Sequence, residues 1–356
     1  MARAGMDVHY LRFHLHRDTD GLLTPTQRAG AAPADLPQPA ELRDLLQLMA
    51  ARGACKVRLV GDDPGRRADL GDLVAMLSGL EGVGEVALTT QGDGLRGRVS
   101  DLSRAGLRSV NFNLDTLRPE RYAALAGGDG DGGAGRAGRT AAAGREGHAA
   151  AGREGHAAAG REGHAAAGRE GHAAVWEALE EALGAGVRVK INCVLRAGVN
   201  LDEVDDFVAL TQDRPIEVRF VEWNASNGQL AAPEDFVPTS AALALIKPAL
   251  VHRESEPFAG PALRFEVPGH IGGLGFIANV TDHFCADCNR LTLTDRADLA
   301  SCIFGRGIHL LRLLRSTAGI ESVDAMIDRV VRRKMSLGAR LNGWDTPGAA
   351  LPATLS

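Results

Sequence analysis

Cysteine is scarce in this chain of 356 residues: there are five, and the first is Cys55. So small and odd a number excludes a disulfide scaffold and favours a reducing compartment. No stretch reaches the roughly 18 apolar residues of a membrane span, and residues 1–13 lack the apolar core of a signal peptide. A formal net charge of −5 argues against capture of nucleic acid or anionic membranes. We therefore expect a cytoplasmic protein with no nucleic-acid or membrane partner.

One tract, residues 127–174, contains no Val, Ile, Leu, Phe or Cys. Its eight-residue repeat begins at Gly144, Gly152, Gly160 and Gly168. Without large apolar side chains the tract cannot bury enough surface to offset the entropy lost on ordering, so the sequence predicts a solvated low-complexity loop. The evenly spaced histidines suggest metal binding, but on a helix a period of eight drifts by about 80° per repeat and places them on different faces.

Elsewhere, short β-rich runs alternate with amphipathic helical patterns. The candidate strands are residues 8–16, 56–61, 85–90, 109–115, 187–195 and 216–223. The candidate helices are residues 40–52, 69–80, 175–186 and 200–212. Strands separated by helices imply parallel βαβ units. The pattern predicts an α/β fold, either an open or closed barrel or a doubly wound sheet.

Cations stand between apolar neighbours on these candidate strands: Arg12, Arg58, Lys190 and Arg219. Because helices cover the outer face of a parallel α/β sheet, the apolar residues are expected outside and the cations on the inner face. Buried cations require an anionic partner. A polyphosphate ligand is one candidate partner. Internal carboxylates are the other: Glu217, Glu222 or Asp115.

Three of the five cysteines lie close together in the sequence: Cys285, Cys288 and Cys302. A Cys-x-x-Cys turn directs two thiolates at one metal centre, and a third thiolate from a returning strand completes it. In a reducing compartment such a group is typical of metal binding rather than of a disulfide. Three thiolates suit an iron–sulfur cluster with one open iron. Zinc, with His283 or Asp287 as the fourth ligand, is the alternative.

The segment HFCADCNRLTLTDRADLASCIFG (283–305) resembles the auxiliary-cluster segment of the MoaA family, the GTP 3′,8-cyclases of molybdenum-cofactor biosynthesis, which are radical SAM enzymes. The resemblance continues in order from Tyr10 to about Leu314. It includes six further stretches: YLRF (10–13), KVRLVGDDP (56–64), ALTTQG (87–92), AGLRSVNFNLD (105–115), VKINCVL (189–195) and IEVRFVEW (216–223).

This resemblance implies an incomplete parallel (β/α) barrel over residues 8–225, interrupted by the repeat insertion at 127–174. A C-terminal domain with an iron–sulfur extension would follow at 226–340, and a tail at 341–356. In the family, one [4Fe–4S] cluster cleaves S-adenosylmethionine and an auxiliary cluster holds the purine of GTP. The auxiliary-cluster ligands correspond here to Cys285, Cys288 and Cys302. The GTP-binding positions correspond to Arg12, Arg58, Thr89, Lys190 and Arg290.

The S-adenosylmethionine side departs from the family pattern. The three cysteines of the first cluster fall at Thr19, Leu23 and Thr26. Other changed positions are Asp62 in the GGEP-like segment, Asn113 in place of a serine, and Asn224 in place of a methionine. A cluster needs thiolates, which Thr and Leu cannot supply. We therefore expect a protein that binds GTP or a related purine nucleotide and one [4Fe–4S] cluster, but has lost radical chemistry.

Several alternatives stay open. The chain is an active GTP 3′,8-cyclase if a partner or an unrecognised site initiates the reaction. It is otherwise a decayed paralogue or a zinc-binding structural protein. The family suggests a homodimer, and a heteromer with another molybdenum-cofactor protein is also open. A final group is either a divalent-metal site or a polar barrel lining: His14, His16, Asp18 and Asp20.

Overall fold

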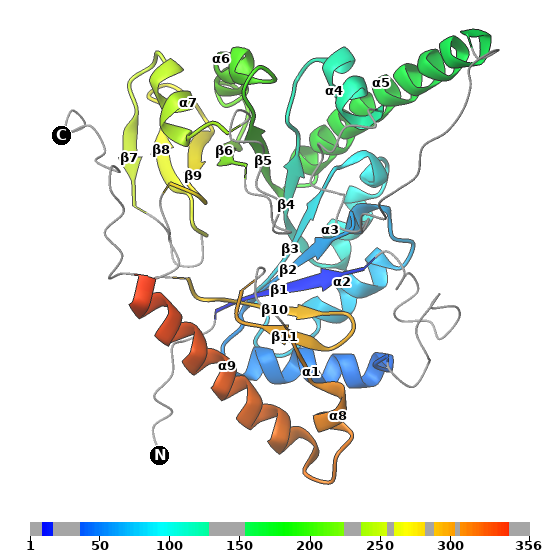
Figure 1. Ribbon diagram of the computed structural model, residues 1–356, viewed down its shortest axis with the longest axis vertical. Helices are drawn as coiled ribbons and strands as arrows, with labels where there is room; N and C mark the ends of the chain where they lie inside the picture. Colours follow the sequence, from blue (N-terminus) through cyan, green and yellow to red (C-terminus); the bar gives the residue numbers. More distant parts are fainter. Residues whose placement is uncertain are drawn as a thin grey trace, which may run out of the picture.

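The computed structural model describes residues 9–16, 36–127, 154–223, 236–254, 260–281, 288–302 and 307–341. These residues form a 12-stranded sheet in the order β12-β11-β10-β1-β2-β3-β4-β5-β6-β9-β8-β7. Its centre is six parallel strands in chain order: β1 (Tyr10–Leu15), β2 (Lys56–Gly61), β3 (Glu85–Thr90), β4 (Leu107–Asn113), β5 (Arg188–Leu195) and β6 (Ile216–Glu222). The expected α/β fold with an incomplete parallel barrel is confirmed (Figure 1).

Strands from the last third of the chain extend both edges of this parallel core. β9 (Gly273–Ile277) lies parallel to β6, and β10 (Arg290–Thr294) lies parallel to β1. The remaining strands pair antiparallel outside them: β8 (Leu263–Glu266) and β7 (Val251–Arg253) beyond β9, and β11 (Asp298–Ala300) and β12 (Ile308–His309) beyond β10. The sheet therefore continues on both sides across the expected boundary at residue 225.

Helices follow the strands and cover the outer face of the sheet (Figure 1). They are α1 (Pro39–Ala51), α2 (Leu70–Ser78), α3 (Val99–Ala105), α4 (Pro119–Gly127), α5 (Glu154–Gly184), α6 (Val204–Ala209), α7 (Thr239–Leu245), α8 (Leu311–Leu314) and α9 (Gly319–Leu341), with short 3₁₀ turns η3 (Pro64–Arg66), η4 (Asp93–Leu95) and η5 (Leu201–Glu203). Within the described residues, no helix is long and apolar enough to cross a membrane.

Strand alternation decides which side chains enter the core. On β5, Val189, Ile191 and Cys193 are buried, whereas Lys190 and Asn192 between them are only partly so. The outward-facing residues of the other strands pack under the helices in the same way, and Phe13, Phe112 and Phe220 are fully buried. A parallel sheet covered by helices buries its apolar face, so the polar residues are left on the inner face.

The loop expected over residues 127–174 is wrong from Glu154 onward, where α5 begins. Only the last part of this helix, over residues 175–186, was expected. That part is anchored by Val175, Leu179 and Ala182, which are fully buried. Extending a helix from an anchored turn costs little, and the repeat is rich in Ala, Arg and Glu, which favour helix. The lack of large apolar side chains in the repeat therefore did not prevent it from forming a helix.

The last repeat unit contributes to packing. Its histidine, His172, is buried, with its ring 5.3 Å from the ring of Tyr122 on α4. Trp176 Nε1 lies 3.2 Å from His172 Nε2 and donates to it. Burial lowers the pKa of His172, which suits a neutral ring that accepts this hydrogen bond. This histidine thus belongs to the α4–α5 contact.

The closest point of that contact is at Gly168, where an added Cβ would lie 2.4 Å from Ala123 Cα. We expect Gly168→Ala to lower the free energy of unfolding by about 1–3 kcal/mol, because the two helices would have to move apart. Gly184→Ala in the same helix is the control, since no heavy atom lies within 4 Å of its added Cβ. Its effect should stay within about 1 kcal/mol. Urea unfolding measures the free energy of unfolding of both variants. Equal changes would contradict close packing of α4 against α5 at Gly168.

Candidate functional site

Four cations surround one tyrosine on the inner face of the sheet. Strand register places Arg12 of β1 opposite Arg58 of β2, and Tyr10 opposite both Lys56 and Arg290. The Lys56 Nζ lies 5.6 Å from the Tyr10 ring centroid, and the guanidinium carbons of Arg58 and Arg290 lie 5.8 and 6.0 Å from it. Burial alone would raise the pKa of Tyr10, but the four cations together lower it. Positive charge dominates this region.

Neutral groups are the partners of Arg58. Its Nε donates to the Tyr10 hydroxyl at 2.5 Å, and its Nη1 donates to the Leu88 carbonyl at 3.4 Å and to Thr89 Oγ1 at 3.3 Å. The side chain is only 5% exposed. Among the described residues, neither Arg12 nor Arg58 forms an ion pair with a carboxylate. A buried cation without an opposite charge is costly, so this pair favours an anionic ligand.

A second group of cations shares one carboxylate. Glu217 of β6 accepts from Lys190 at 3.3 Å, from Arg219 at 2.5 Å and from Arg264 at 2.7 Å. Burial would raise the pKa of Glu217, but these cations lower it to about 2. Burial, followed by the charge of Arg219, lowers the pKa of Lys190 to about 7. For Lys190 and Arg219, therefore, the internal-carboxylate alternative is confirmed.

The other two candidate carboxylates are engaged elsewhere. Glu222 accepts from the backbone amides of Thr239 at 3.0 Å and Val280 at 2.9 Å. Asp115 accepts from the Val194 amide at 2.9 Å. The hypothesis that these two balance the strand cations is wrong. The reason is that both follow or end a strand and cap neighbouring backbone instead of facing the inner sheet surface.

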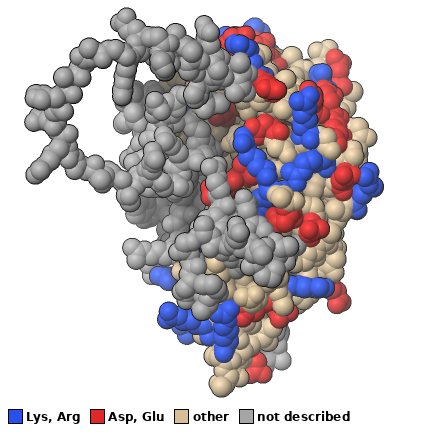
Figure 2. All heavy atoms as spheres, turned by 90° about the vertical axis from the view of Figure 1, so that its right-hand side faces the viewer, with Lys and Arg blue, Asp and Glu red and all other residues tan. Residues whose placement is uncertain are grey.

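A cavity of about 930 Å³ opens at the amino ends of the parallel strands. It extends to β7 and β8, and its lining includes Lys56, Glu85, Lys190, Glu217 and Arg264. This volume lies at the upper end of those that bind small molecules and nucleotides. On the outer face drawn in Figure 2, acidic and basic side chains are interspersed across the described residues. The opening on the inner side likewise brings cations together with carboxylates.

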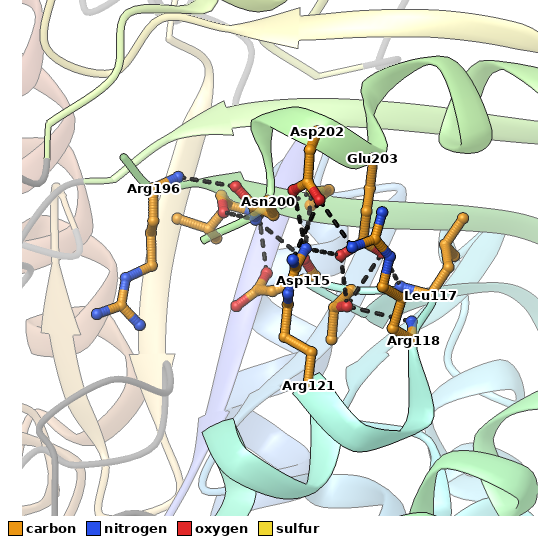
Figure 3. Close-up of polar contacts among 11 residues, drawn as sticks. Asp115, Leu117, Arg118, Arg121, Arg196, Asn200, Asp202 and Glu203 are labelled. Carbon is orange, nitrogen blue, oxygen red and sulfur yellow. Dashed lines mark hydrogen bonds and ion pairs between the residues drawn. The ribbon is translucent and has the colours of Figure 1, made fainter. Parts of the chain in front are cut away.

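A dense polar network fixes the opposite, carboxyl ends of β4 and β5 (Figure 3). Asn200 donates from Nδ2 to the carbonyls of Asp115 at 2.9 Å and Val194 at 2.8 Å, and its Oδ1 accepts from the Arg196 amide at 3.0 Å. Burial raises the pKa of Asp115 to about 6. Fully buried Glu203 joins the same network from η5. The loops after both strands are therefore held in one arrangement.

Residues at the S-adenosylmethionine positions bond to one another or to neighbouring elements. Asp63, next to Asp62, accepts from Thr90 Oγ1 at 2.5 Å and from the Gln91 amide at 3.1 Å. Asn113 Oδ1 accepts from Asn192 Nδ2 at 3.0 Å. The remaining positions lie outside the described residues: Thr19, Leu23, Thr26 and Asn224.

His14 on β1 and His16, directly after the strand, lie near this end of the barrel. His16 Nδ1 lies 2.6 Å from Asp295 Oδ1, and the His14 and His16 rings are 4.8 Å apart. His14 Nδ1 is buried and has no hydrogen-bond partner among the residues that the structure describes. Asp18 and Asp20 lie outside the described residues, and within those residues no three His, Cys, Asp or Glu side chains are arranged to hold a metal ion. The described part of the chain therefore offers this histidine pair no third ligand.

Two of the three clustered cysteines are described, and Cys285 is not. Cys288 precedes β10 and Cys302 follows β11, so the antiparallel pairing of these strands brings both cysteines to one end of the hairpin. Burial would raise the pKa of Cys288, but Arg290 and Lys334 lower it to about 7. A thiol that ionises this readily fits a metal-thiolate centre.

Known proteins resemble the chain over most of its length. Residues 216–337 match the family model "Molybdenum Cofactor Synthesis C". The GTP 3′,8-cyclase of Pelotomaculum thermopropionicum is 33% identical over 311 residues, which cover 85% of this chain and 83% of that protein. The chain belongs to the GTP 3′,8-cyclase family.

Other members of that family agree. The mitochondrial GTP 3′,8-cyclase of Arabidopsis thaliana is 31% identical over 84% of this chain and 67% of its own length. The mouse molybdenum cofactor biosynthesis protein 1 is 32% identical over 85% of this chain and 42% of its own. A solved structure of Streptococcus suis SuiB aligns with 9% identity over 89% of this chain and 68% of that one, at a TM-score of 0.45, and adds nothing to the fold assignment.

Sequence reasoning missed three side chains of the site. Tyr10 and Lys56 are at strand positions whose alternation already directs them inward, so that signal was available for both. Lys334 contacts Cys288 from a helix 46 residues further along the chain, and nothing in the sequence near Cys288 points to it.

The network at the carboxyl ends of β4 and β5 makes a testable prediction. Glu203 accepts from Thr116 Oγ1 at 2.7 Å and the Leu117 amide at 2.6 Å, and pairs with Arg121. We expect Glu203→Gln to lower the free energy of unfolding by about 1–3 kcal/mol, because buried donors lose a charged acceptor. Its neighbour Asp202 is half-exposed, so Asp202→Asn should cost less than about 1 kcal/mol. Guanidinium unfolding measures both variants; a neutral Glu203→Gln would contradict the role of this network.

Proposed function

We propose that this member of the GTP 3′,8-cyclase family binds GTP, or a related purine nucleotide, on the inner face of its half-barrel. The observation that carries the proposal is the pair Arg12 and Arg58, in register on adjacent strands, partly buried and buried respectively, without an ion-paired carboxylate among the described residues. A triphosphate supplies several negative oxygens at once, and one guanidinium group can bind two of them through two parallel N–H···O hydrogen bonds. Such a ligand would thereby compensate the positive charges of Arg12 and Arg58.

The other proposed nucleotide residues extend from this pair in both directions. Thr89 holds Arg58 by a hydrogen bond, and Lys190 lies further around the sheet, paired with Glu217. Arg290 lies on the opposite side, beside Tyr10 and near Cys288. In this arrangement a nucleotide whose phosphates face Arg12 and Arg58 would direct its base toward Arg290 and the cysteine hairpin.

At that hairpin we propose one [4Fe–4S] cluster, held by Cys285, Cys288 and Cys302. The donor set is suitable because the thiol of Cys288 ionises readily and two cationic side chains lie beside it. Three cysteine ligands leave one iron with an open coordination position, which is the chemistry such a cluster supplies when bound. Under this proposal the cysteine hairpin is part of the C-terminal domain at 226–340, next to the barrel at 8–225.

The S-adenosylmethionine side does not fit a second cluster. Thr19, Leu23 and Thr26 provide no thiolate, and a radical-initiating cluster cannot be held without them. Asp63, beside the changed Asp62, is already engaged by Thr90 and Gln91. We therefore propose that the chain has lost radical initiation and acts through nucleotide and cluster binding.

A second candidate function is active GTP 3′,8-cyclase. The observation that favours it is the relationship to enzymes of that name over 83% of the length of one of them. It requires a partner protein, or a second copy of the chain, to supply the initiating group. Production of the radical cleavage product distinguishes it from the first proposal.

Isothermal titration calorimetry with GTP tests the nucleotide site. We expect Arg58→Met to weaken binding about 10- to 100-fold, because a charge-assisted hydrogen bond contributes about 1.5–3 kcal/mol. Arg104→Met is the control, since Arg104 lies 74% exposed on α3. No heat with GTP in the unaltered chain would overturn the nucleotide proposal.

Anaerobic reconstitution with iron and sulfide tests the cluster. We expect about four irons per chain, and their loss in Cys288→Ser and Cys302→Ser. Cys55→Ser is the matched control, because Cys55 is half-buried just before β2 and its thiol donates to the His9 carbonyl, away from the hairpin. Stoichiometric zinc would replace the iron proposal, and about eight irons would indicate a second cluster.

Incubation of the reconstituted protein with dithionite, GTP and S-adenosylmethionine tests the loss of radical chemistry. We expect no 5′-deoxyadenosine, because no thiolates are present at the three N-terminal positions. Clear formation of 5′-deoxyadenosine by this chain alone would overturn the proposed loss and restore the enzyme function.

A further inference from the structure

A lysine occupies an apolar position of the C-terminal helix. The buried stripe of α9 contains Val323, Ile327, Val330 and Val331, and Lys334 follows at the same helical spacing. Its side chain is only 7% exposed. Lysine is almost never buried unless it is paired, because removing an ammonium group from water is costly. An unusual contact must therefore account for its position.

The contacts of Lys334 are made with the cysteine hairpin. Its Nζ lies 3.2 Å from Cys288 Sγ and donates to the Ser301 carbonyl at 2.7 Å. Ser301 immediately precedes Cys302, so a single ammonium group touches both segments of the hairpin, one carrying Cys288 and the other Cys302. Among the described residues no carboxylate forms an ion pair with Lys334. Among the described residues, the cysteine sulfur of the hairpin is thus the group that can provide Lys334 with negative charge.

The helix that carries this lysine is also held from a side other than the hairpin. Arg52 at the end of α1 donates to Asp324 at 2.5 Å and to Asp328 at 2.7 Å. Figure 1 shows α9 running beside α1 and below the β10–β11 hairpin. Because ion pairs and buried valines hold α9 in place, the ammonium group is directed at Cys288 by the packing of the fold.

We infer that Lys334 is a positioning residue of the cysteine-held metal centre, which donates a hydrogen bond to Cys288 Sγ and makes the centre easier to reduce. This inference rests on the proposed cluster. Reduction adds one electron, supplied by an external reductant, to a group that thiolates already make anionic. A nearby ammonium and an N–H···S hydrogen bond both favour the more negative state. Groups that surround metal ligands set redox potentials in this way.

The potential of the reconstituted cluster, followed by electron paramagnetic resonance during reductive titration, tests the inference. We expect Lys334→Met to lower the equilibrium constant for reduction at least about tenfold, which is about 59 mV for one electron. Lys334→Gln keeps a donor without the charge and should give a smaller shift. Arg332→Met, at an exposed position of the same helix, is the control and should give none. An unchanged potential and spectrum in Lys334→Met would overturn the role of Lys334.

If Lys334→Met does not retain its cluster, a measurement on the metal-free protein tests the contact between Lys334 and Cys288 instead. Iodoacetamide reacts with thiolates, so we expect Lys334→Met to slow labelling of Cys288 several-fold in the metal-free protein. Mass spectrometry identifies the site, and Cys302 in the same molecule is the internal reference. Unchanged labelling of Cys288 would overturn the inference. Absence of iron in the unaltered chain would instead overturn the proposed function, so the two failures are distinguishable.

Discussion

The inner face of the sheet is organised around two arginines that form no ion pair with a carboxylate in the part of the chain that the structure describes. Arg12 and Arg58 lie in register on adjacent strands, and the hydrogen-bond partners of Arg58 are a phenol, a hydroxyl and a carbonyl. On either side the charges are balanced, by Glu85 for Lys56 and by Glu217 for Lys190. Among the described residues, carboxylates therefore pair with the cations at the margins of the inner face but not with the two at its centre. An anionic ligand bound at the centre would balance the charges of Arg12 and Arg58.

The two ends of the parallel strands have different physical characters. At the amino ends a cavity opens between the barrel and β7–β9, and its walls carry both signs of charge. At the carboxyl ends, Asn200 and Glu203 satisfy the backbone and hydroxyl groups of the neighbouring loop, which leaves little freedom to rearrange. The cavity and the rigid network thus lie at opposite ends of the parallel strands.

The parts predictable from the sequence are those governed by local pattern. Residues 56–61 and 85–90 form strands with the expected bounds, because each is a β-rich run that ends at glycine or a turn. Inward-facing Arg12, Arg58 and Lys190 followed from alternation alone. Helix α5 was not foreseen over the repeat, because its anchor lies beyond the repeat, at Val175 and Leu179. Lys334 was missed because its partner lies 46 residues away and only the fold brings them together.

The pairing of β9 with β6 and of β10 with β1 has a consequence during synthesis. When the ribosome has completed β6, both edges of the parallel sheet still expose unpaired backbone, because the strands that cover them are encoded later. Such edges are templates for association with other chains. The edge of β6 stays uncovered for about 50 residues of synthesis, between Glu222 and Gly273, and the edge of β1 until β10 begins at Arg290, so association with other chains is favoured in this interval.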